Sequence, residues 1–311
     1  MQPVVNRSGF ALIVTLLVTS LMVAVAVEMI HQVYVDMTLS RGFRDGQQAS
    51  ILAESGVTGG AKLLQLGLAS REYTSLSDPW AMPIKLDDET GTLEITVSEE
   101  GGKINLNGLV YANGEYEPFT YAALKRLGKR LQISESAWSS LADWLDGDDL
   151  PRSGGAETPY YRSLKPGYAA RNGKLTTVTE LLLVRDFSAD ALARLRPFVT
   201  TYSGQAGAPL STININTASR EVLAALDDRI DDRMADRIIE ERRLQPFRST
   251  AELSRIPGMD TVSIALQGKI SAKGSLFRIT SVARVKDAGR TVEAIVRVGN
   301  GTFEFLSWQE F

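Results

Sequence analysis

Five acidic residues crowd into one short segment of the sequence, DWLDGDDLPRSGGAETPYY, at residues 143–161. They are Asp143, Asp146, Asp148, Asp149 and Glu157, with Gly147, Gly154 and Gly155 among them. Calcium takes about six to eight oxygen ligands from a flexible backbone, so this composition suits it better than magnesium or a transition metal. Because the spacing is not that of an EF-hand loop, a solvated acidic loop or a helix cap is the alternative interpretation.

No other segment has a residue pattern typical of catalysis. The chain contains no cysteine, and its single histidine, His31, directly follows an apolar run, which excludes thiol nucleophiles and a histidine triad elsewhere. The motifs GxSxG and SxxK and a phosphate-binding lysine loop are absent. We expect Trp138, Trp144, Tyr160 and Tyr161 to pack in a core or a loop rather than to line a ligand site. The sequence predicts no enzyme.

Length and charge set the class of the protein. A chain of 311 residues with 44% hydrophobic residues is long enough for about two domains with sizeable cores. The formal net charge is −3, and acidic and basic residues are mixed along the chain. There is therefore no basic field to attract nucleic-acid phosphates.

The N-terminal segment predicts a membrane span. Residues 10–27 contain no charge and, as a helix rising about 1.5 Å per residue, would cover roughly the hydrocarbon core of a bilayer. Arg7 precedes the run, and the next basic residue is Arg41. This asymmetry predicts a cytoplasmic N-terminus and a body in the periplasm.

The alternative is an ordinary secretory signal peptide cleaved near Ala24–Ala26. Against it, the apolar run is longer than usual, and sequence compatible with a helix continues without proline to about Ser70. Residues at alternating spacings of three and four predict a helix face that packs on another element. They are Ala49, Leu52, Gly56, Gly59, Leu63 and Leu66.

Two segments alternate apolar and polar residues, as strands do. In residues 92–107 the alternation continues on both sides of Gly101-Gly102, which predicts a hairpin that turns there. In residues 276–299 two alternating runs meet at residues 287–290, which predicts a second hairpin. Antiparallel strands thus flank the middle of the chain.

The middle, residues 108–270, has mainly helical periodicity and looks duplicated. Each half follows an asparagine-rich start, KINLN or NINTAS. The two halves align Glu180-Leu181 with Glu252-Leu253 and Val184 with Ile256.

The start of the chain resembles the leader of type IV pilins and type II secretion pseudopilins. A basic residue is followed by Gly9, Phe10 and a long apolar helix. The resemblance implies cleavage after Gly9 by a membrane peptidase and methylation of Phe10. Most such subunits carry glutamate at the fifth mature position, where this chain has Val14. That glutamate is thought to neutralise a neighbour's N-terminal amine in the apolar filament core, so its absence suits a subunit at the tip.

Essentially the whole chain resembles the K family of type II secretion minor pseudopilins. The segments GFALIVTLLV, GGKINLN, DWLDGDD with GAETPYY, and NINTAS occur in that order. The resemblance implies an α+β fold: a long N-terminal helix and a small antiparallel sheet, with an inserted, duplicated helical domain like SAM or helix-hairpin-helix modules. The implied divisions are 1–9 leader, 10–70 membrane segment and long helix, 71–107 first β part, 108–270 inserted helices, and 271–311 C-terminal strands.

The resemblance also favours a calcium site over a solvated acidic loop or a helix cap, because a calcium-binding loop is described in the helical domain of K subunits. Asp146, Asp148 and Glu157 are the preferred ligands, with Asp143 and Asp149 as second choices. Asp143 could instead cap a helix or brace Arg152.

The implied function is a minor pseudopilin that starts or caps a periplasmic filament for export of folded proteins across the outer membrane. Its partners would be I-type and J-type minor pseudopilins, the inner membrane and secreted cargo, with no nucleic acid. The alternatives are a minor pilin of a type IV pilus and a membrane-tethered helix-hairpin-helix DNA-binding protein. The second is disfavoured because the phosphate-binding glycines of the hairpin turns are largely replaced. The turns read Arg-Ile-Asp at residues 229–231 and Gly-Met-Asp at 258–260, so carboxylates would face phosphate.

Overall fold

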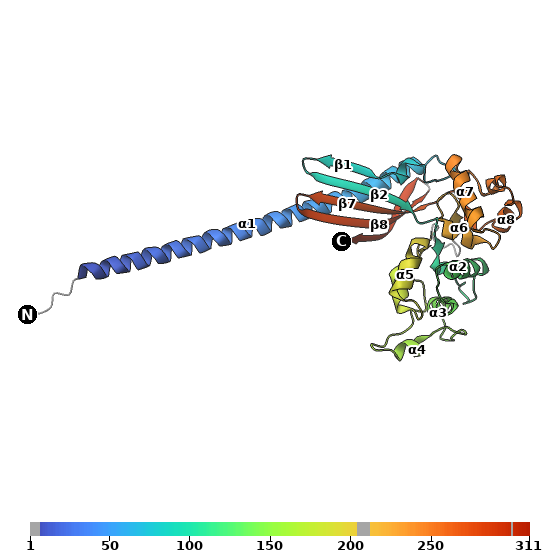
Figure 1. The fold of residues 1–311 in the computed structure, drawn as a ribbon, viewed down its shortest axis with the longest axis horizontal. Helices are drawn as coiled ribbons and strands as arrows, with labels where there is room; N and C mark the ends of the chain where they lie inside the picture. The colour runs from blue at the N-terminus through green and yellow to red at the C-terminus, as the bar shows by residue number, and fades with distance from the viewer. Residues whose placement is uncertain (1–6, 204–211, 300) are drawn as a thin grey trace, which may run out of the picture.

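The computed structural model of the chain describes residues 7–203, 212–299 and 301–311. One long helix projects from a body in which a sheet lies along its C-terminal part, and further helices lie beyond the end of that sheet (Figure 1). The prediction of an α+β fold with a long N-terminal helix and a small antiparallel sheet is confirmed.

The α-helices are α1 (Arg7–Leu68), α2 (Pro118–Arg130), α3 (Glu135–Leu145), α4 (Thr158–Arg162), α5 (Ala189–Leu195), α6 (Arg220–Leu226), α7 (Asp232–Leu244) and α8 (Asp260–Ala265). The 3-10 helices are η1 (Pro79–Ala81), η2 (Leu106–Gly108), η3 (Val178–Leu183), η4 (Arg196–Phe198) and η5 (Thr250–Arg255). The strands are β1 (Ile84–Asp88), β2 (Gly91–Glu99), β3 (Ile104–Asn105), β4 (Val199–Thr200), β5 (Ile213–Asn214), β6 (Ile270–Ser271), β7 (Leu276–Val285), β8 (Ala288–Gly299) and β9 (Thr302–Glu310).

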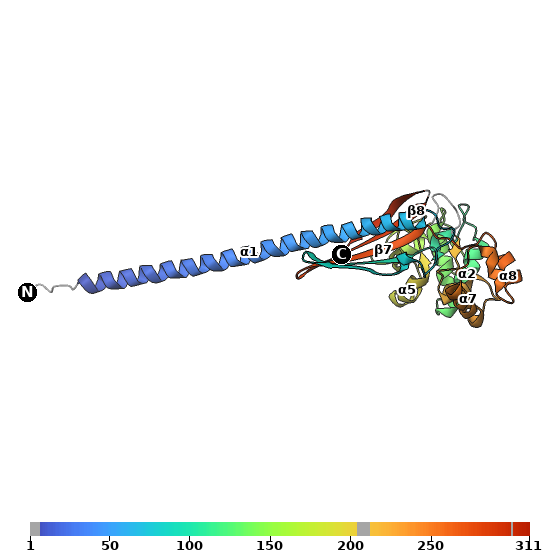
Figure 2. The same cartoon turned by 90° about the horizontal axis from the view of Figure 1, so that it is seen from above.

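Helix α1 is continuous over 62 residues, as its lack of proline predicts. Its N-terminal part extends away from the body, and its C-terminal part lies along the sheet (Figure 2). Among the described residues it is the one helix long and apolar enough to cross a membrane. Its most apolar window has a mean hydropathy of 2.7, and none of that window is buried in the protein. The apolar surface there therefore lacks a partner within the chain.

Five strands form the main sheet in the order β1-β2-β7-β8-β9, and all neighbours are antiparallel. Strand β2 pairs with β7, which lies far along the sequence, with Glu99 opposite Phe277. One face of the sheet packs on α1 through a core that includes Ala53, Val57 and Leu64. The helical part of the chain is inserted between the two central strands β2 and β7.

The face of α1 that meets the sheet differs from the predicted one. Ala49 and Gly56 are buried as expected, but Gly59 faces solvent, and Leu63 and Leu66 are 55% and 64% exposed. The helix approaches the sheet closely at Gly56, where an added Cβ would lie 2.3 Å from Ser281 Oγ. The predicted positions repeat about every 3.5 residues, whereas the buried positions follow the turn of a straight helix, about 3.6 residues: Ala49, Ala53, Val57, Leu64 and Leu68. The predicted face therefore drifts away from the sheet toward the C-terminal end of the helix.

The predicted hairpin at Gly101-Gly102 is also wrong. The hairpin lies earlier in the chain, between β1 and β2, and β3 after the glycines pairs in parallel with β4. A Cβ on Gly102 would lie 2.9 Å from the Ala218 amide nitrogen, and Gly101 O accepts a hydrogen bond from Asn214 N at 2.9 Å. The two glycines do form a turn, closed by the hydrogen bond from Lys103 N to Glu100 O at 3.2 Å, but the strand that follows it pairs with β4 and not with β2. They also allow the close backbone approach. The C-terminal hairpin is confirmed, with Lys286 and Asp287 between β7 and β8.

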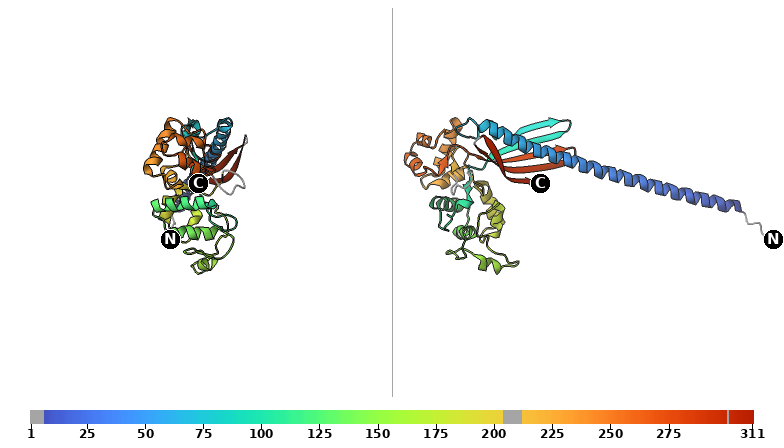
Figure 3. Two further views of the ribbon diagram at one scale, coloured as in Figure 1. Left: turned by 90° about the vertical axis from the view of Figure 1, so that its right-hand side faces the viewer. Right: turned by 180° about the vertical axis from the view of Figure 1, so that it is seen from behind.

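The inserted helices form two units with the same plan, drawn green to yellow and orange in Figure 3. The first is closed by the parallel pair β3-β4 and the second by the parallel pair β5-β6. Asn107 exchanges hydrogen bonds of 2.7 and 2.9 Å with the backbone of Leu175, and Asn216 does so with Phe247 at 2.9 and 2.8 Å. These are the asparagines of the two predicted repeat starts.

The glutamates aligned in the sequence also occupy equivalent places. Glu180 accepts a hydrogen bond from Thr176 N at 3.1 Å, and Glu252 accepts one from Arg248 N at 3.0 Å. In both units this glutamate lies in a 3-10 helix that begins two residues before it. The duplication predicted from the sequence is therefore present in the fold.

A buried glutamate lies where the sheet meets the second unit. Glu99, at the end of β2, accepts hydrogen bonds from Asn214 Nδ2 at 2.8 Å and from Thr74 Oγ1 at 3.1 Å. Thr74 Oγ1 in turn accepts from the amide of Gly274, just before β7. Burial raises the pKa of Glu99 to about 7, because the hydrogen bonds from these neutral donors do not compensate for the lost hydration. The negative charge of nearby Asp78 acts in the same direction as burial.

We predict that Glu99 makes the protein more stable as pH falls. Its ordinary pKa is 4.5, so between that value and about 7 the folded chain holds a proton that the unfolded chain has released. The stability that Glu99 adds is fully present below its pKa in the unfolded chain, and it is lost as pH rises through its pKa in the folded chain. At about 1.4 kcal/mol per pH unit, it amounts to roughly 3 kcal/mol. Thermal midpoints of the detergent-solubilised protein between pH 4.5 and 8 measure it.

Glu99→Gln should flatten this dependence, and Glu72→Gln, at an exposed position, is the control. A Glu99→Gln variant with the same pH profile as the wild type would contradict the assignment.

Candidate metal centre

Three predicted ligand residues meet at the two ends of the acidic segment. Asp143 lies in the last turn of α3, Asp146 is its C-cap residue, and Glu157 is the N-cap residue of α4. Helix α3 ends at Leu145, and its C-cap residue Asp146, with a ψ of 177°, turns the chain into the glycine-bearing loop. Pro159 lies in the first turn of α4. Residues three apart lie on one face of a helix, so both aspartates face the same side.

The three carboxylates are close together and buried. One oxygen from each lies within 4.8 Å of the other two, and the residues are 0%, 5% and 2% exposed for Asp143, Asp146 and Glu157. Asp146 Oδ1 and both carboxylate oxygens of Glu157 have no hydrogen-bond partner. Buried carboxylates without partners are costly, so the arrangement favours a bound cation.

Arg152 partly neutralises this cluster. Its Nη1 donates to Asp143 Oδ1 at 2.6 Å and also to Asp146 Oδ2, and its backbone N–H donates to Asp143 Oδ2 at 3.1 Å. Nη2 donates to the carbonyl of Gly114, and the guanidinium lies over the ring of Tyr116, 5.1 Å from its centroid. Bracing of Arg152 by Asp143, one of the roles considered for that residue, is therefore observed.

The electrostatics of the cluster disfavour full ionisation. Burial, together with the neighbouring charges of Asp143 and Asp146, raises the pKa of Glu157 to about 8. Burial also raises the pKa of Asp143, although its hydrogen bonds from Arg152 act in the opposite direction. One guanidinium is thus too little positive charge for three carboxylates.

The backbone approaches the cluster closely at Gly155. A Cβ at this position would lie 1.9 Å from Asp143 Oδ2, so any side chain would displace the carboxylate. Gly154, beside it, has a φ of 80°, which favours glycine. By contrast, a Cβ at Gly147 would meet nothing within 4 Å.

The other two predicted ligands lie on the exposed loop, outside this group of three. Asp148 Oδ1 accepts a hydrogen bond from Leu150 N at 2.8 Å. Asp149 Oδ1 is 3.4 Å from Asn172 Nδ2. The structure thus brings together Asp143, a second-choice ligand, with the preferred Asp146 and Glu157. The signal for this set was the helical spacing of the aspartates, because it placed both on one face of α3.

The predicted aromatic packing is confirmed for most of its residues. Trp138, Trp144 and Tyr161 belong to the core of the helical units, and Tyr160 is partly exposed. The predicted processing residues Gly9 and Phe10 and the tip marker Val14 all lie on the exposed N-terminal part of α1.

The helical units match models of one protein family. Its description is type II secretion system (T2SS), protein K, and its two models match residues 102–204 and 213–273. These ranges coincide with the two units closed by β3-β4 and β5-β6.

Whole-chain relatives carry the same description. The type II secretion system protein K of Pseudomonas aeruginosa is 32% identical over 264 residues, which cover 80% of this chain and 77% of the relative. The protein of that description from Aeromonas hydrophila is 28% identical over 319 residues, covering 93% of this chain and 92% of the relative.

A solved structure shares the fold. It is a chain in the crystal structure of the GspK-GspI-GspJ complex from the type 2 secretion system of enterotoxigenic Escherichia coli. The TM-score is 0.74 at 21% identity, covering 88% of this chain and 99% of that chain.

We predict that Gly155→Ala destabilises the protein, whereas Gly147→Ala in the same loop is tolerated. The added methyl group at residue 155 must push Asp143 away from Arg152, a clash that we expect to cost about 1–3 kcal/mol. Thermal midpoints of both variants, measured in detergent without added metal, provide the comparison. Equal midpoints would show that Asp143 can move freely and that the cluster is not packed as described.

Proposed function

The chain belongs to the type II secretion system protein K family, and from that membership we propose that it forms the tip of the pseudopilus. There it would start or cap the filament that exports folded proteins across the outer membrane. The observation that carries this proposal is the position of the two helical units. They lie beyond the end of the sheet opposite the projecting part of α1 (Figure 1).

This position would block growth at one end. A filament of parallel subunits repeats one heterologous contact between the top of one subunit and the bottom of the next, and it continues until a surface is blocked. The helical units place bulk at the top of this subunit. Val14 supports the same end position, because it offers no carboxylate to the N-terminal amine of a subunit above.

The projecting part of α1 supports an inner-membrane anchor. We propose a single span with a cytoplasmic N-terminus and a periplasmic body, as the basic residue Arg7 before the apolar run favours. We further propose cleavage between Gly9 and Phe10 with methylation of Phe10, so that α1 stays in the mature protein. The intact mass of the purified protein reports the cleavage site, and a chain beginning near Val27 would contradict it.

The partners we propose are the I-type and J-type minor pseudopilins, since the solved structure with this fold is named as a complex of GspK with GspI and GspJ. Lateral contact would not use Ala49 and Gly56, which are buried against the chain's own sheet. The exposed face of α1 with Gly59, Leu63 and Leu66 is available instead.

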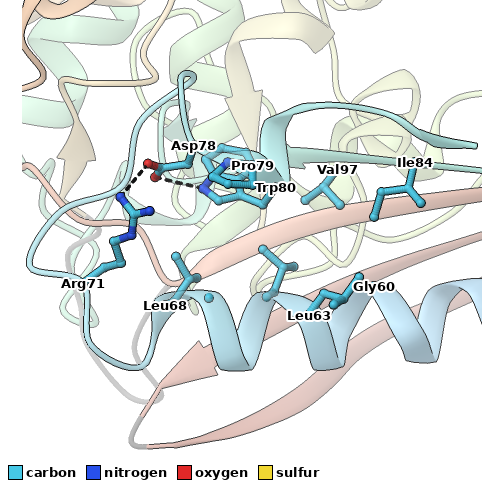
Figure 4. Close-up of a pocket in the computed structure, with 11 residues that line it drawn as sticks. Gly60, Leu63, Leu68, Arg71, Asp78, Pro79, Trp80, Ile84 and Val97 are labelled. Carbon is cyan, nitrogen blue, oxygen red and sulfur yellow. Dashed lines mark hydrogen bonds and ion pairs between the residues drawn. The ribbon is translucent and has the colours of Figure 1, made fainter.

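An apolar groove of about 200 Å³ continues this face, between α1 and the segment around Trp80 (Figure 4). Asp78 accepts hydrogen bonds there from Arg71 and from the Trp80 indole, both at 3.1 Å, which fixes one wall of the groove. We propose that a helix of a partner subunit lies along it. Secreted cargo is a further proposed partner.

We propose no catalytic role and no nucleic-acid partner. The turn between α6 and α7, where a DNA-binding hairpin would hold phosphate, carries Asp227, Asp228 and Asp231. Arg229 in this turn is already paired with Asp227 at 2.7 Å. Carboxylates at this position would repel phosphate. Membership of the K family favours a pseudopilus over a type IV pilus.

We propose that the cluster of Asp143, Asp146 and Glu157 holds calcium. The three oxygens without partners and the excess of carboxylates over Arg152 fit a divalent cation, and oxygen ligands suit calcium. Bound calcium would supply the missing positive charge at this buried site. Asp148 and Asp149 would complete the site only if their loop moved toward the cluster.

Labelling of assembled filaments tests the tip position. We expect gold particles against the periplasmic body to mark filament ends, and Val14→Glu to retain assembly but become less confined to the ends, because it restores a carboxylate in the apolar core. Val18→Glu, one turn further along α1, controls for the effect of any added charge. Wild-type labelling spread evenly along filaments would defeat the proposal.

Calcium should raise the thermal midpoint of chelator-stripped protein, because a ligand that binds the folded state alone stabilises it, by about 2.7 kcal/mol at a hundredfold excess over Kd. Glu157→Gln should remove this gain. Asp148→Asn, on the exposed loop, should keep it if the three buried carboxylates are the site. The absence of any shift in the wild type at millimolar calcium would reject the metal.

A further inference from the structure

Arg152 occupies carboxylate oxygens that a cation at this site could use. Its Nη1 contacts Asp143 Oδ1 and Asp146 Oδ2, one oxygen of each of the two aspartates in the cluster. It makes no hydrogen bond or ion pair with Glu157, whose two oxygens have no hydrogen-bond partner among the described residues. The guanidinium therefore neutralises one side of the cluster and leaves the other unbalanced.

The arginine side chain can leave this position more easily than the carboxylates can. The side chain of Arg152 is 21% exposed, whereas those of Asp143 and Asp146 are 0% and 2% exposed. A flexible stem that reaches in from the surface can turn outward without opening a cavity in the core. The backbone N–H of Arg152 would still hold Asp143.

A divalent cation and the guanidinium cannot share these oxygens without strong repulsion. Two like charges about 4 Å apart repel by several kcal/mol at the effective dielectric constant typical of protein sites. One of the two must therefore move when the other binds. Of the described groups around the cluster, the arginine is the mobile one.

We propose that Arg152 is a resident counter-ion that a divalent cation displaces, and that its displacement releases the surface turn at residues 111–116. The inference rests on the calcium site proposed above. The turn is held from the cluster side, because Arg152 Nη2 donates to Gly114 O and the guanidinium lies over Tyr116. A Cβ added at Gly114 would lie within 3.8 Å of both Asp146 and Arg152, so the turn packs directly on the site.

Metal binding at the buried cluster would therefore change the surface turn at residues 111–116. Without metal, the arginine ties the turn to α3. With metal, the turn loses its link to the cluster, so its own bonds, such as Tyr111 N to Glu115 O at 2.8 Å and Gly114 N to Tyr111 O at 3.0 Å, open more often. Metal loading would thus loosen residues 111–116 while it stabilises the carboxylates.

Calcium titration of full-length, chelator-stripped protein in detergent tests the proposal by calorimetry. Arg152→Met removes the competing charge and keeps much of the stem, so it should bind calcium about tenfold or more tightly than the wild type, which corresponds to about 1.4 kcal/mol. Arg152→Lys should fall between them. Arg162→Met, an exposed arginine in α4 near the cluster, is the matched control and should bind like the wild type.

Weaker or equal binding by Arg152→Met would overturn the proposal, because it would show that Arg152 stays in place and positions the aspartates. If the wild type binds calcium, such a result leaves the metal site standing and removes only the counter-ion role. If neither protein binds calcium at millimolar concentration, both the metal site and the displacement are rejected.

Hydrogen exchange of the wild type keeps the test decisive even if the arginine variants fold poorly. Calcium should increase exchange of the amides of Tyr111 and Gly114 while it slows exchange around Asp146 and Glu157. Unchanged or slower exchange across residues 111–116 on calcium binding would overturn the proposed release of the turn.

Discussion

The pairing of β2 with β7 is the constraint on which the rest of the structure depends. The chain leaves the sheet at Glu99 and must return beside it, since Glu99 lies opposite Phe277 and Glu100 N donates to Leu276 O at 2.9 Å. Neighbouring strands lie about 4.8 Å apart, so everything inserted between them must begin and end at nearly the same point. Each of the two inserted units meets this requirement, because a short parallel strand pair brings its start and its end together. The second unit is also tied to the exit point, where Asn214 contacts both Gly101 and Glu99.

Buried carboxylates lie where the chain leaves the sheet and within the first helical unit, and they are stabilised in different ways. Glu99 has neutral donors alone, and burial raises its pKa. Glu100, the next residue, is equally buried but lies against Lys103 and Arg278, and these cations hold its pKa below the ordinary value despite burial. The difference follows from direction, since successive residues of a strand point to opposite faces. In the proposed metal centre, Arg152 contacts both aspartates and Glu157 has no hydrogen-bond partner among the described residues, which is why this cluster is the candidate cation site.

The sequence predicts the features that depend on periodicity and composition. The continuous α1, the C-terminal hairpin and the repeated asparagine starts all follow from local patterns that no tertiary contact overrides. Glycines are harder to interpret, because the same residue serves a turn or a close approach. Gly102 serves both, and the close approach of Ala218 that requires it joins segments far apart in sequence. The buried face of α1 was mistaken for a different reason. The predicted positions follow a repeat of about 3.5 residues, which over several turns drifts off the face that a straight helix of about 3.6 residues per turn holds against the sheet.

The ligand set shows how far residue types alone determine a site. Composition places five carboxylates in one loop, but only the helical spacing of Asp143 and Asp146 and the start of α4 at Glu157 decide which of them become buried together. The cluster lies in the first helical unit, whose core joins α2, α3 and α4 and whose closure depends on Asn107. The sheet has a separate core with α1. Because the two cores are distinct, the proposed cation would act directly on the helical unit, and the packing of α1 on the sheet would not depend on it.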